Sequence, residues 1–131
     1  MRRIELLLGL LVACGGSDTH AVPPKAPNNE LILGTFERHP PDGSTAFRFR
    51  ADGSITIAHD KGELDSKPLA AGTWQVDKTE LTLTYDSGMC KGNGPGVYTV
   101  VISKRGLHLT KVSDACDQRA KLDGETLWRV N

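Results

Sequence analysis

The residues that could carry chemistry are few and widely spaced. The chain has 131 residues, with three cysteines and four histidines. It contains no Gly-x-Ser-x-Gly elbow, no His-Glu-x-x-His motif, no phosphate-binding loop and no calcium-binding loop. His39, His59 and His108 are scattered, and Asp114 and Asp117 fit the start of a helix better than a paired acid and base. We therefore expect no catalytic residue, no metal site and no cofactor.

The first of the three cysteines, Cys14, follows a short apolar segment at the N-terminus. Arg2 and Arg3 precede an uninterrupted apolar run at residues 6–13, which is too short for a membrane-spanning helix of about 20 residues. The run ends in Leu11-Val12-Ala13-Cys14, which resembles the lipobox of bacterial lipoproteins. This resemblance implies a signal peptide at residues 1–13, fatty acyl chains such as palmitate on Cys14, and a membrane anchor in the bacterial cell envelope, on the periplasmic or outer-membrane face. The alternative is an ordinary secretion signal with an incidental cysteine.

The segment that follows is expected to be a tether. Residues 15–30 read GGSDTHAVPPKAPNNE and contain almost no apolar side chains. Because this composition cannot bury enough surface to fold, we expect a lipidated cysteine and flexible linker at residues 14–30 and one domain at residues 31–131. The whole chain balances 16 basic against 16 acidic residues, which argues against nucleic acid as a partner.

From Leu31 onwards the sequence predicts strands and tight turns. Alternating apolar and polar residues over 72–77 and 80–86 predict a hairpin with one buried and one solvent-facing side. A short helix of about two turns is expected at residues 114–122, with Asp114 capping its first amides. No long helical stretch separates the strands, so the pattern predicts an all-β barrel or two-layer sandwich. The other strands are expected at residues 31–37, 45–51, 54–58, 96–103, 107–112 and 126–130.

Cys90 and Cys116 are the cysteines that remain once Cys14 is assigned to lipid. Export would place them in an oxidising compartment, so we expect a disulfide joining the loop after the fifth strand to the helix before the eighth. A reactive or metal-binding thiol pair is the alternative. No histidine lies near either cysteine in the sequence, and their spacing matches no short metal motif.

A set of framework positions spreads over residues 31–131. It comprises Gly72-Thr73-Trp74, Leu81-Thr82-Leu83, Cys90, Gly96-Val97-Tyr98, Leu107-His108-Leu109, Asp114-Ala115-Cys116, Arg119 and Trp128-Arg129. This pattern resembles the small lipocalin-like domains of bacterial secreted proteins and lipoproteins. The resemblance implies a calycin-type fold, an eight-stranded antiparallel up-and-down barrel with one short helix before the last strand.

The chain departs from lipocalins proper at one position. In lipocalins a Gly-x-Trp on the first strand plugs one end of the barrel, and a late arginine stacks over that tryptophan. Here the first strand has Gly34-Thr35-Phe36, and the tryptophan version comes later, at Trp74. Arg119 and Arg129 are both candidates for the stacking arginine.

Whether the barrel is hollow or filled bears directly on function. An eight-stranded barrel is just wide enough to be filled by its own side chains or to hold one small ligand. We expect a plug, and the lining of any pocket, from Phe36, Phe47, Phe49, Trp74, Tyr85, Tyr98, Arg119, Trp128 and Arg129. Any pocket should be shallow and at one open end. The rest of the inward set is expected to be Ile32, Ile55, Ile57, Val76, Leu81, Leu83, Val100, Ile102, Leu107, Leu109 and Val130.

Two classes of function stay open besides catalysis, for which no convergent polar set is visible. The first is a binding module for a small apolar or amphipathic molecule, which the barrel resemblance favours. The second is a protein-interaction module, such as an inhibitor of an envelope enzyme or an assembly accessory, with a partner that the sequence does not identify. A basic strip of Arg38, Arg48, Arg50 and Lys61 that faces anionic lipid or glycan is an alternative to an ordinary solvated strand face.

Overall fold

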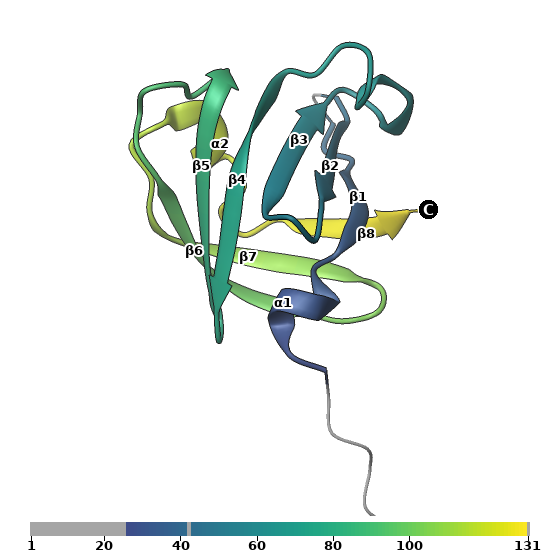
Figure 1. Ribbon diagram of the computed structural model, residues 1–131, viewed down its shortest axis with the longest axis vertical. Helices are drawn as coiled ribbons and strands as arrows, with labels where there is room; N and C mark the ends of the chain where they lie inside the picture. Colours follow the sequence, from purple (N-terminus) through teal and green to yellow (C-terminus); the bar gives the residue numbers. More distant parts are fainter. Residues whose placement is uncertain (1–25, 42, 131) are drawn as a thin grey trace, which may run out of the picture.

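Eight strands close into a single barrel in the computed structural model, which describes residues 26–41 and 43–130 (Figure 1). Each strand pairs antiparallel with the next, and β1 pairs with β8 to complete the ring. This confirms the predicted up-and-down barrel with a short helix before the last strand. Cys14, the proposed signal peptide and most of the proposed linker lie outside the described residues. The elements in order are α1 (Asn28–Leu31), β1 (Gly34–Arg38), β2 (Thr45–Phe49), β3 (Ser54–Ala58), the 3-10 turn η4 (Lys61–Glu63), β4 (Ala70–Asp77), β5 (Glu80–Gly88), β6 (Gly96–Ile102), β7 (Gly106–Ser113), α2 (Asp117–Ala120) and β8 (Thr126–Val130).

The chain enters the barrel through a helical turn rather than a strand. Leu31 N–H donates to the Pro27 carbonyl at 3.0 Å, and Ile32 N–H donates to the Asn28 carbonyl at 3.0 Å. The apolar residues Leu31 and Ile32 were predicted to begin the first strand, but β1 starts at Gly34. Ile32 is fully buried nonetheless. Its burial comes from the helical turn packing onto the barrel, so apolar character alone gave the wrong element.

Side chains from all eight strands form one hydrophobic cluster inside the barrel. Phe36 and Tyr98 are fully buried. Phe49 packs edge-on against Phe36 on one side and Trp74 on the other, with ring centroids 5.8 and 6.0 Å apart. Such aromatic pairs fill volume in a fixed geometry. The interior is therefore filled by the chain's own side chains.

The predicted inward phase of the last strand was wrong. Leu127 is 1% exposed and belongs to the core, whereas Trp128 is 52% exposed on the outside of the barrel. Val130 is only partly buried. The physical reason is Arg129, which shares the inward phase with Leu127 and uses its guanidinium group to close one end of the barrel.

Arg129 closes the end of the barrel formed by the turns at residues 50–53, 78–79 and 103–105, which we call the hairpin end. Its Nη1 donates to the Leu33 carbonyl at 2.8 Å and its Nη2 to the Leu31 carbonyl at 2.6 Å. Its Nε donates to the Lys104 carbonyl at 3.0 Å. The guanidinium carbon lies 4.6 Å from the centre of the Phe36 ring. Of the two candidate stacking arginines, Arg129 is thus the one that covers the first-strand aromatic residue.

The opposite end, which we call the loop end, carries the four longer connections at residues 39–44, 59–69, 89–95 and 114–125. Figure 1 shows α2 beside the upper end of β5, far from α1 at the hairpin end. In the part of the chain that the structure describes, neither helix has the length or hydropathy to cross a bilayer.

Candidate functional site

A shallow pocket of about 300 Å³ opens at the loop end of the barrel. All four strand connections at this end contribute residues to its wall, together with the strand ends beside them. The lining residues are Arg38, Gly43, Ser44, Thr45, His59, Leu69, Met89, Gln118 and Lys121. The volume corresponds to the lower end of small-molecule sites in proteins.

Leu69 and Met89 are the large apolar residues that line the pocket, and we call them its floor. Met89 packs against the barrel core. Met89 N–H donates to the Leu69 carbonyl at 3.1 Å, and Leu69 N–H donates to the Ile57 carbonyl at 2.7 Å. These hydrogen bonds extend the pairing of β3, β4 and β5 into the loops. The floor is therefore a continuation of the sheet rather than a separate segment.

The rim of the pocket is polar and carries positive charge. Arg38 Nε lies 3.2 Å from Glu125 Oε1, an ion pair whose two side chains are only partly exposed. Lys121 also lines the pocket and is exposed. His59 is also exposed, and its carbonyl accepts a hydrogen bond from Ser44 Oγ at 3.0 Å. An apolar floor beneath such a rim suits a molecule with one apolar part and one anionic part.

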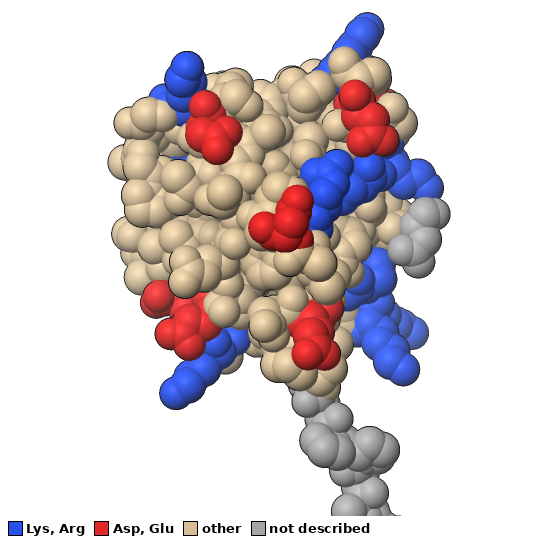
Figure 2. Space-filling view, viewed as in Figure 1, with Lys and Arg blue, Asp and Glu red and all other residues tan. Residues whose placement is uncertain are grey.

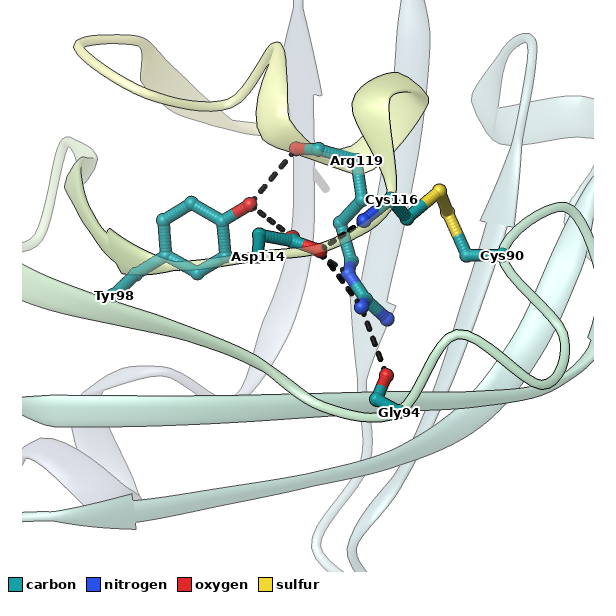
Figure 3. Close-up of polar contacts among 6 residues, drawn as sticks. All are labelled: Cys90, Gly94, Tyr98, Asp114, Cys116 and Arg119. Carbon is teal, nitrogen blue, oxygen red and sulfur yellow. Dashed lines mark hydrogen bonds and ion pairs between the residues drawn. A yellow bond between two sulfur atoms is a disulfide. The ribbon is translucent and has the colours of Figure 1, made fainter.

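A buried ion pair fixes the side of the loop end that carries α2 (Figure 3). Arg119 Nε donates to Asp114 Oδ2 at 2.7 Å, and Arg119 Nη2 donates to Asp114 Oδ1 at 2.9 Å. Arg119 Nη2 also donates to the Gly94 carbonyl at 2.9 Å, which ties the loop before β6 to the helix. Both charged side chains are 0% exposed. This bidentate geometry is that of a strong arginine–carboxylate pair.

Two further groups complete the hydrogen bonding of Asp114. Tyr98 Oη lies 2.5 Å from Asp114 Oδ2 and 2.9 Å from the Arg119 carbonyl. The backbone N–H of Cys116 donates to Asp114 Oδ1 at 2.9 Å. Burial on its own would raise the pKa of Asp114, but the hydrogen bonds from Arg119, Tyr98 and Cys116 outweigh it and lower that pKa. Asp114 is therefore an ionised structural anion, not the cap of α2 that the sequence predicted.

The same environment sets the ionisation of the other members of the cluster. Burial, followed by the hydrogen bond to Asp114, raises the pKa of Tyr98. Burial likewise raises the pKa of Tyr85, whose ring lies 4.9 Å from the Arg119 guanidinium carbon. For Arg119, burial would lower the pKa, but the hydrogen bond and charge of Asp114 raise it. Tyr85 Oη and Arg119 Nη1 are the two atoms of this cluster that are buried without a hydrogen-bond partner among the described residues.

The disulfide predicted between Cys90 and Cys116 is confirmed, with Cα atoms 5.6 Å apart. It joins the loop after β5 to the residue before α2, next to the ion pair (Figure 3). The helix itself is one turn, Asp117–Ala120, and not the two turns predicted. The backbone at Cys116, which the disulfide holds, is extended, so the helix begins only at Asp117. The carboxylate of Asp114 pairs with the Arg119 side chain instead of capping an earlier turn.

None of the nine residues predicted as plug or pocket lining contacts the pocket at the loop end. Phe36, Phe47, Phe49, Tyr85 and Tyr98 fill the interior, Arg119 is buried beside them, and Arg129 closes the hairpin end. Trp74 is partly buried, and its Nε1 donates to the Arg50 carbonyl at 2.9 Å. Trp128 faces outwards. The residues that do line the pocket come mostly from loops, and none of them was predicted from the sequence to line a pocket.

The described residues hold no group of three or more histidine, cysteine, aspartate or glutamate side chains placed to bind a metal ion. The fold and the site define a closed, filled antiparallel barrel with a pocket at one mouth. Neither a scan against protein-family models nor a search of curated proteins found a match for this chain.

Proposed function

We propose that this protein is a lipocalin-like lipoprotein of the bacterial cell envelope and acts as a non-catalytic binding module for a small amphipathic ligand. The observation that carries the proposal is the pocket at the loop end, with its apolar floor and basic rim. The barrel shape, the capping arginine over Phe36 and the lipobox-like sequence at Cys14 support it.

The filled interior limits the size of the ligand. Because the core side chains occupy the barrel, a ligand has the mouth and not the full length of the barrel available. A short apolar group would cover Leu69 and Met89, and an anionic group would lie near Lys121 and Arg38. Electrostatic attraction at such a rim favours a negatively charged head over a neutral one.

A displacement assay with a fluorescent fatty-acid analogue tests this function. The probe must be extrinsic, because neither Trp74 nor Trp128 lines the pocket. We expect saturable binding by the full chain in nonionic detergent, with short-chain carboxylates displacing the probe. Met89→Trp, which would fill the floor, and Lys121→Glu, which would reverse a rim charge, should each weaken binding. Lys104→Glu, an exposed change at the hairpin end, is the matched control.

Two results would count against the proposal. Probe binding that is unaffected by both pocket variants would place the ligand elsewhere, and the absence of saturable binding would argue against a small amphipathic ligand. Anchoring is tested separately by feeding cells a palmitate analogue. We expect label on the wild-type chain and none on Cys14→Ser.

A protein-interaction module is the second candidate, and the outer face of β6–β8 favours it. Val101 and Trp128 are 66% and 52% exposed, and both line a groove of about 270 Å³. Large exposed aromatic residues are enriched at protein interfaces. Affinity purification from envelope extract with the wild type and Trp128→Gln tests this alternative. A specific partner that is captured by the wild type and lost with Trp128→Gln would support it.

A further inference from the structure

The outer face of the barrel carries two arginine side chains that share one carboxylate. Arg48 Nη1 lies 3.3 and 3.4 Å from the two carboxylate oxygens of Asp65, and Arg50 Nη2 lies 3.7 Å from Oδ1. These distances exceed the roughly 2.8 Å of a well-formed charge-assisted hydrogen bond. The Asp65 side chain is 78% exposed. Asp65 is therefore a loosely held counter-ion for two guanidinium groups.

The sheet orients both guanidinium groups without help from Asp65. Thr35 on β1 and Thr56 on β3 are the cross-strand neighbours of Arg48, and both are buried. Arg48 Nε donates to Thr35 Oγ1 at 3.1 Å, and Arg50 Nη1 donates to Thr56 Oγ1 at 2.7 Å. Each arginine keeps outward N–H groups that are not used by the threonines. The two side chains are thus held ready to receive an oxyanion.

The loop that carries Asp65 has its own anchor on the same face. Leu64 is 2% exposed and packs against Ala46 and Ala58 on the outside of β2 and β3. Asp60 Oδ1 accepts a hydrogen bond from Glu63 N–H at 3.1 Å at the start of η4. The attachment of the loop therefore does not depend on the carboxylate of Asp65.

We propose that Arg48 and Arg50 form a binding site for a phosphate group, either free or on a lipid or glycan headgroup, and that Asp65 occupies this site as an internal competitor. Two guanidinium groups face a single carboxylate, so the site has a surplus positive charge. A phosphate monoester carries about −1.5 to −2 charge and three acceptor oxygens, so it balances both arginines where Asp65 balances one. Arginine binds phosphate through pairs of N–H groups, which this arrangement provides.

The neighbouring acid does not fill the same role. Asp52 lies near Arg50, but its Oδ1 accepts hydrogen bonds from Ser54 N–H at 2.9 Å and Ser54 Oγ–H at 2.6 Å. These bonds lower the pKa of Asp52, and the charge of Arg50 adds a smaller effect. Figure 2 shows basic side chains with acidic ones beside them on the side of the molecule where β1–β3 lie, and further basic side chains elsewhere around the molecule. This site is separate from the pocket at the loop end, because neither arginine lines that pocket.

Calorimetric titration of the full chain in nonionic detergent tests the proposal. The probes are inorganic phosphate, glycerol phosphate and a soluble short-chain phosphatidic acid. Asp65→Asn should bind phosphate about three-fold more tightly or better, because the competitor is removed, and Arg48→Gln or Arg50→Gln should bind about ten-fold more weakly. Arg105→Gln, which changes an exposed arginine at the hairpin end, should bind like the wild type.

The comparison of probes identifies the source of the phosphate group. Tighter binding of phosphatidic acid than of phosphate assigns a lipid headgroup, and tighter binding of glycerol phosphate assigns a phosphorylated polyol such as a glycan headgroup. Equal affinities assign the phosphate group alone.

Arg48→Lys separates a loss of phosphate binding from misfolding of the glutamine variants. It keeps the positive charge beside Thr35 but lacks the paired N–H groups, so its phosphate affinity should fall while its thermal midpoint stays near that of the wild type. If Asp65 serves only to clamp the loop, Asp65→Asn will lower the thermal midpoint and neither protein will bind phosphate, which overturns the proposal. Binding that persists in the Arg48→Gln/Arg50→Gln double variant also overturns it.

Discussion

Replacing Asp114 by asparagine is the sharpest test of how the loop end is held together. Asparagine keeps the shape of the side chain but removes the charge that Arg119 and Tyr98 bind inside the protein. Arg119 would remain fully buried with an unbalanced positive charge. Breaking a buried ion pair in this way costs about 3–5 kcal/mol of the free energy of unfolding. In a domain of this size, each kcal/mol corresponds to about 4–8 °C, so the thermal midpoint should fall by at least about 12 °C.

The pH dependence of this loss has a definite sign. The folded-state pKa of Asp114 lies below its ordinary value of 3.8. A depressed carboxyl pKa stabilises the fold above the unfolded-state pKa, and this stabilisation is lost as the pH falls through the folded-state pKa. The difference between wild type and Asp114→Asn should therefore be constant above about pH 5 and should narrow below the ordinary pKa of aspartate. Denaturant unfolding monitored by circular dichroism across this range measures it.

Two controls make the result decisive. Asp117→Asn changes an exposed acid in the first turn of α2 and should alter stability by no more than about 0.5 kcal/mol. The double variant Asp114→Asn/Arg119→Met should lose less stability than the two single changes added together, because it leaves no unpaired charge. A loss below about 1 kcal/mol for Asp114→Asn, or strictly additive effects in the double variant, would refute the reasoning.

Three further predictions concern the other parts of the framework. Replacing Cys90 and Cys116 by alanine opens a covalent loop with a sequence separation of 26, which should lower the free energy of unfolding by about 3.5 kcal/mol in chemical denaturation; no change would mean that the noncovalent contacts alone fix the loop. Burial raises the pKa of both tyrosines, the only two in the chain, so their stabilising contribution is lost as the pH rises above the ordinary value of 10.0. Phenolate absorbance should then appear together with unfolding, and a phenolate signal that precedes the loss of circular dichroism would contradict this. Arg129→Gln should cost about 2 kcal/mol or more in urea unfolding because it leaves two partly buried carbonyl groups without a partner, whereas Trp128→Gln should stay within about 0.5 kcal/mol. The reverse order would contradict the assigned phase of β8.

The strands could be predicted from the sequence wherever one face is buried by apolar side chains. The hairpin of β4 and β5 shows this, because Leu81, Leu83 and Tyr85 alternate with polar residues and all three are buried. The same reasoning failed in β8. Arg129 occupies an inward position there because its guanidinium group reaches backbone carbonyls at the end of the barrel, and a rule that places charge outside cannot anticipate this.

The candidate site could not be predicted because its parts are brought together only by closure of the barrel. Arg38 is the last residue of β1, Met89 follows β5 and Lys121 follows α2, so no local pattern joins them. Asp114 was assigned to the nearest helix by a local capping rule, but its side-chain partners are Arg119 on the helix and Tyr98 on β6. A buried arginine in a small β-rich domain requires an acid nearby. The short separation of Asp114 and Arg119 in the sequence was therefore the one feature that could have indicated their ion pair.

The contacts that join the loops at the loop end have a consequence for binding. Strand pairing holds the barrel wall, but residues 90–95 and 114–122 extend beyond the paired strands and would move independently without other contacts. The disulfide, the Asp114–Arg119 pair and the hydrogen bond to the Gly94 carbonyl connect these two segments to each other and to β6. Met89, next to the first segment, and Lys121, in the second, both line the pocket. A ligand would thus meet a rim that is already ordered, and the entropy lost on binding would be smaller than for free loops.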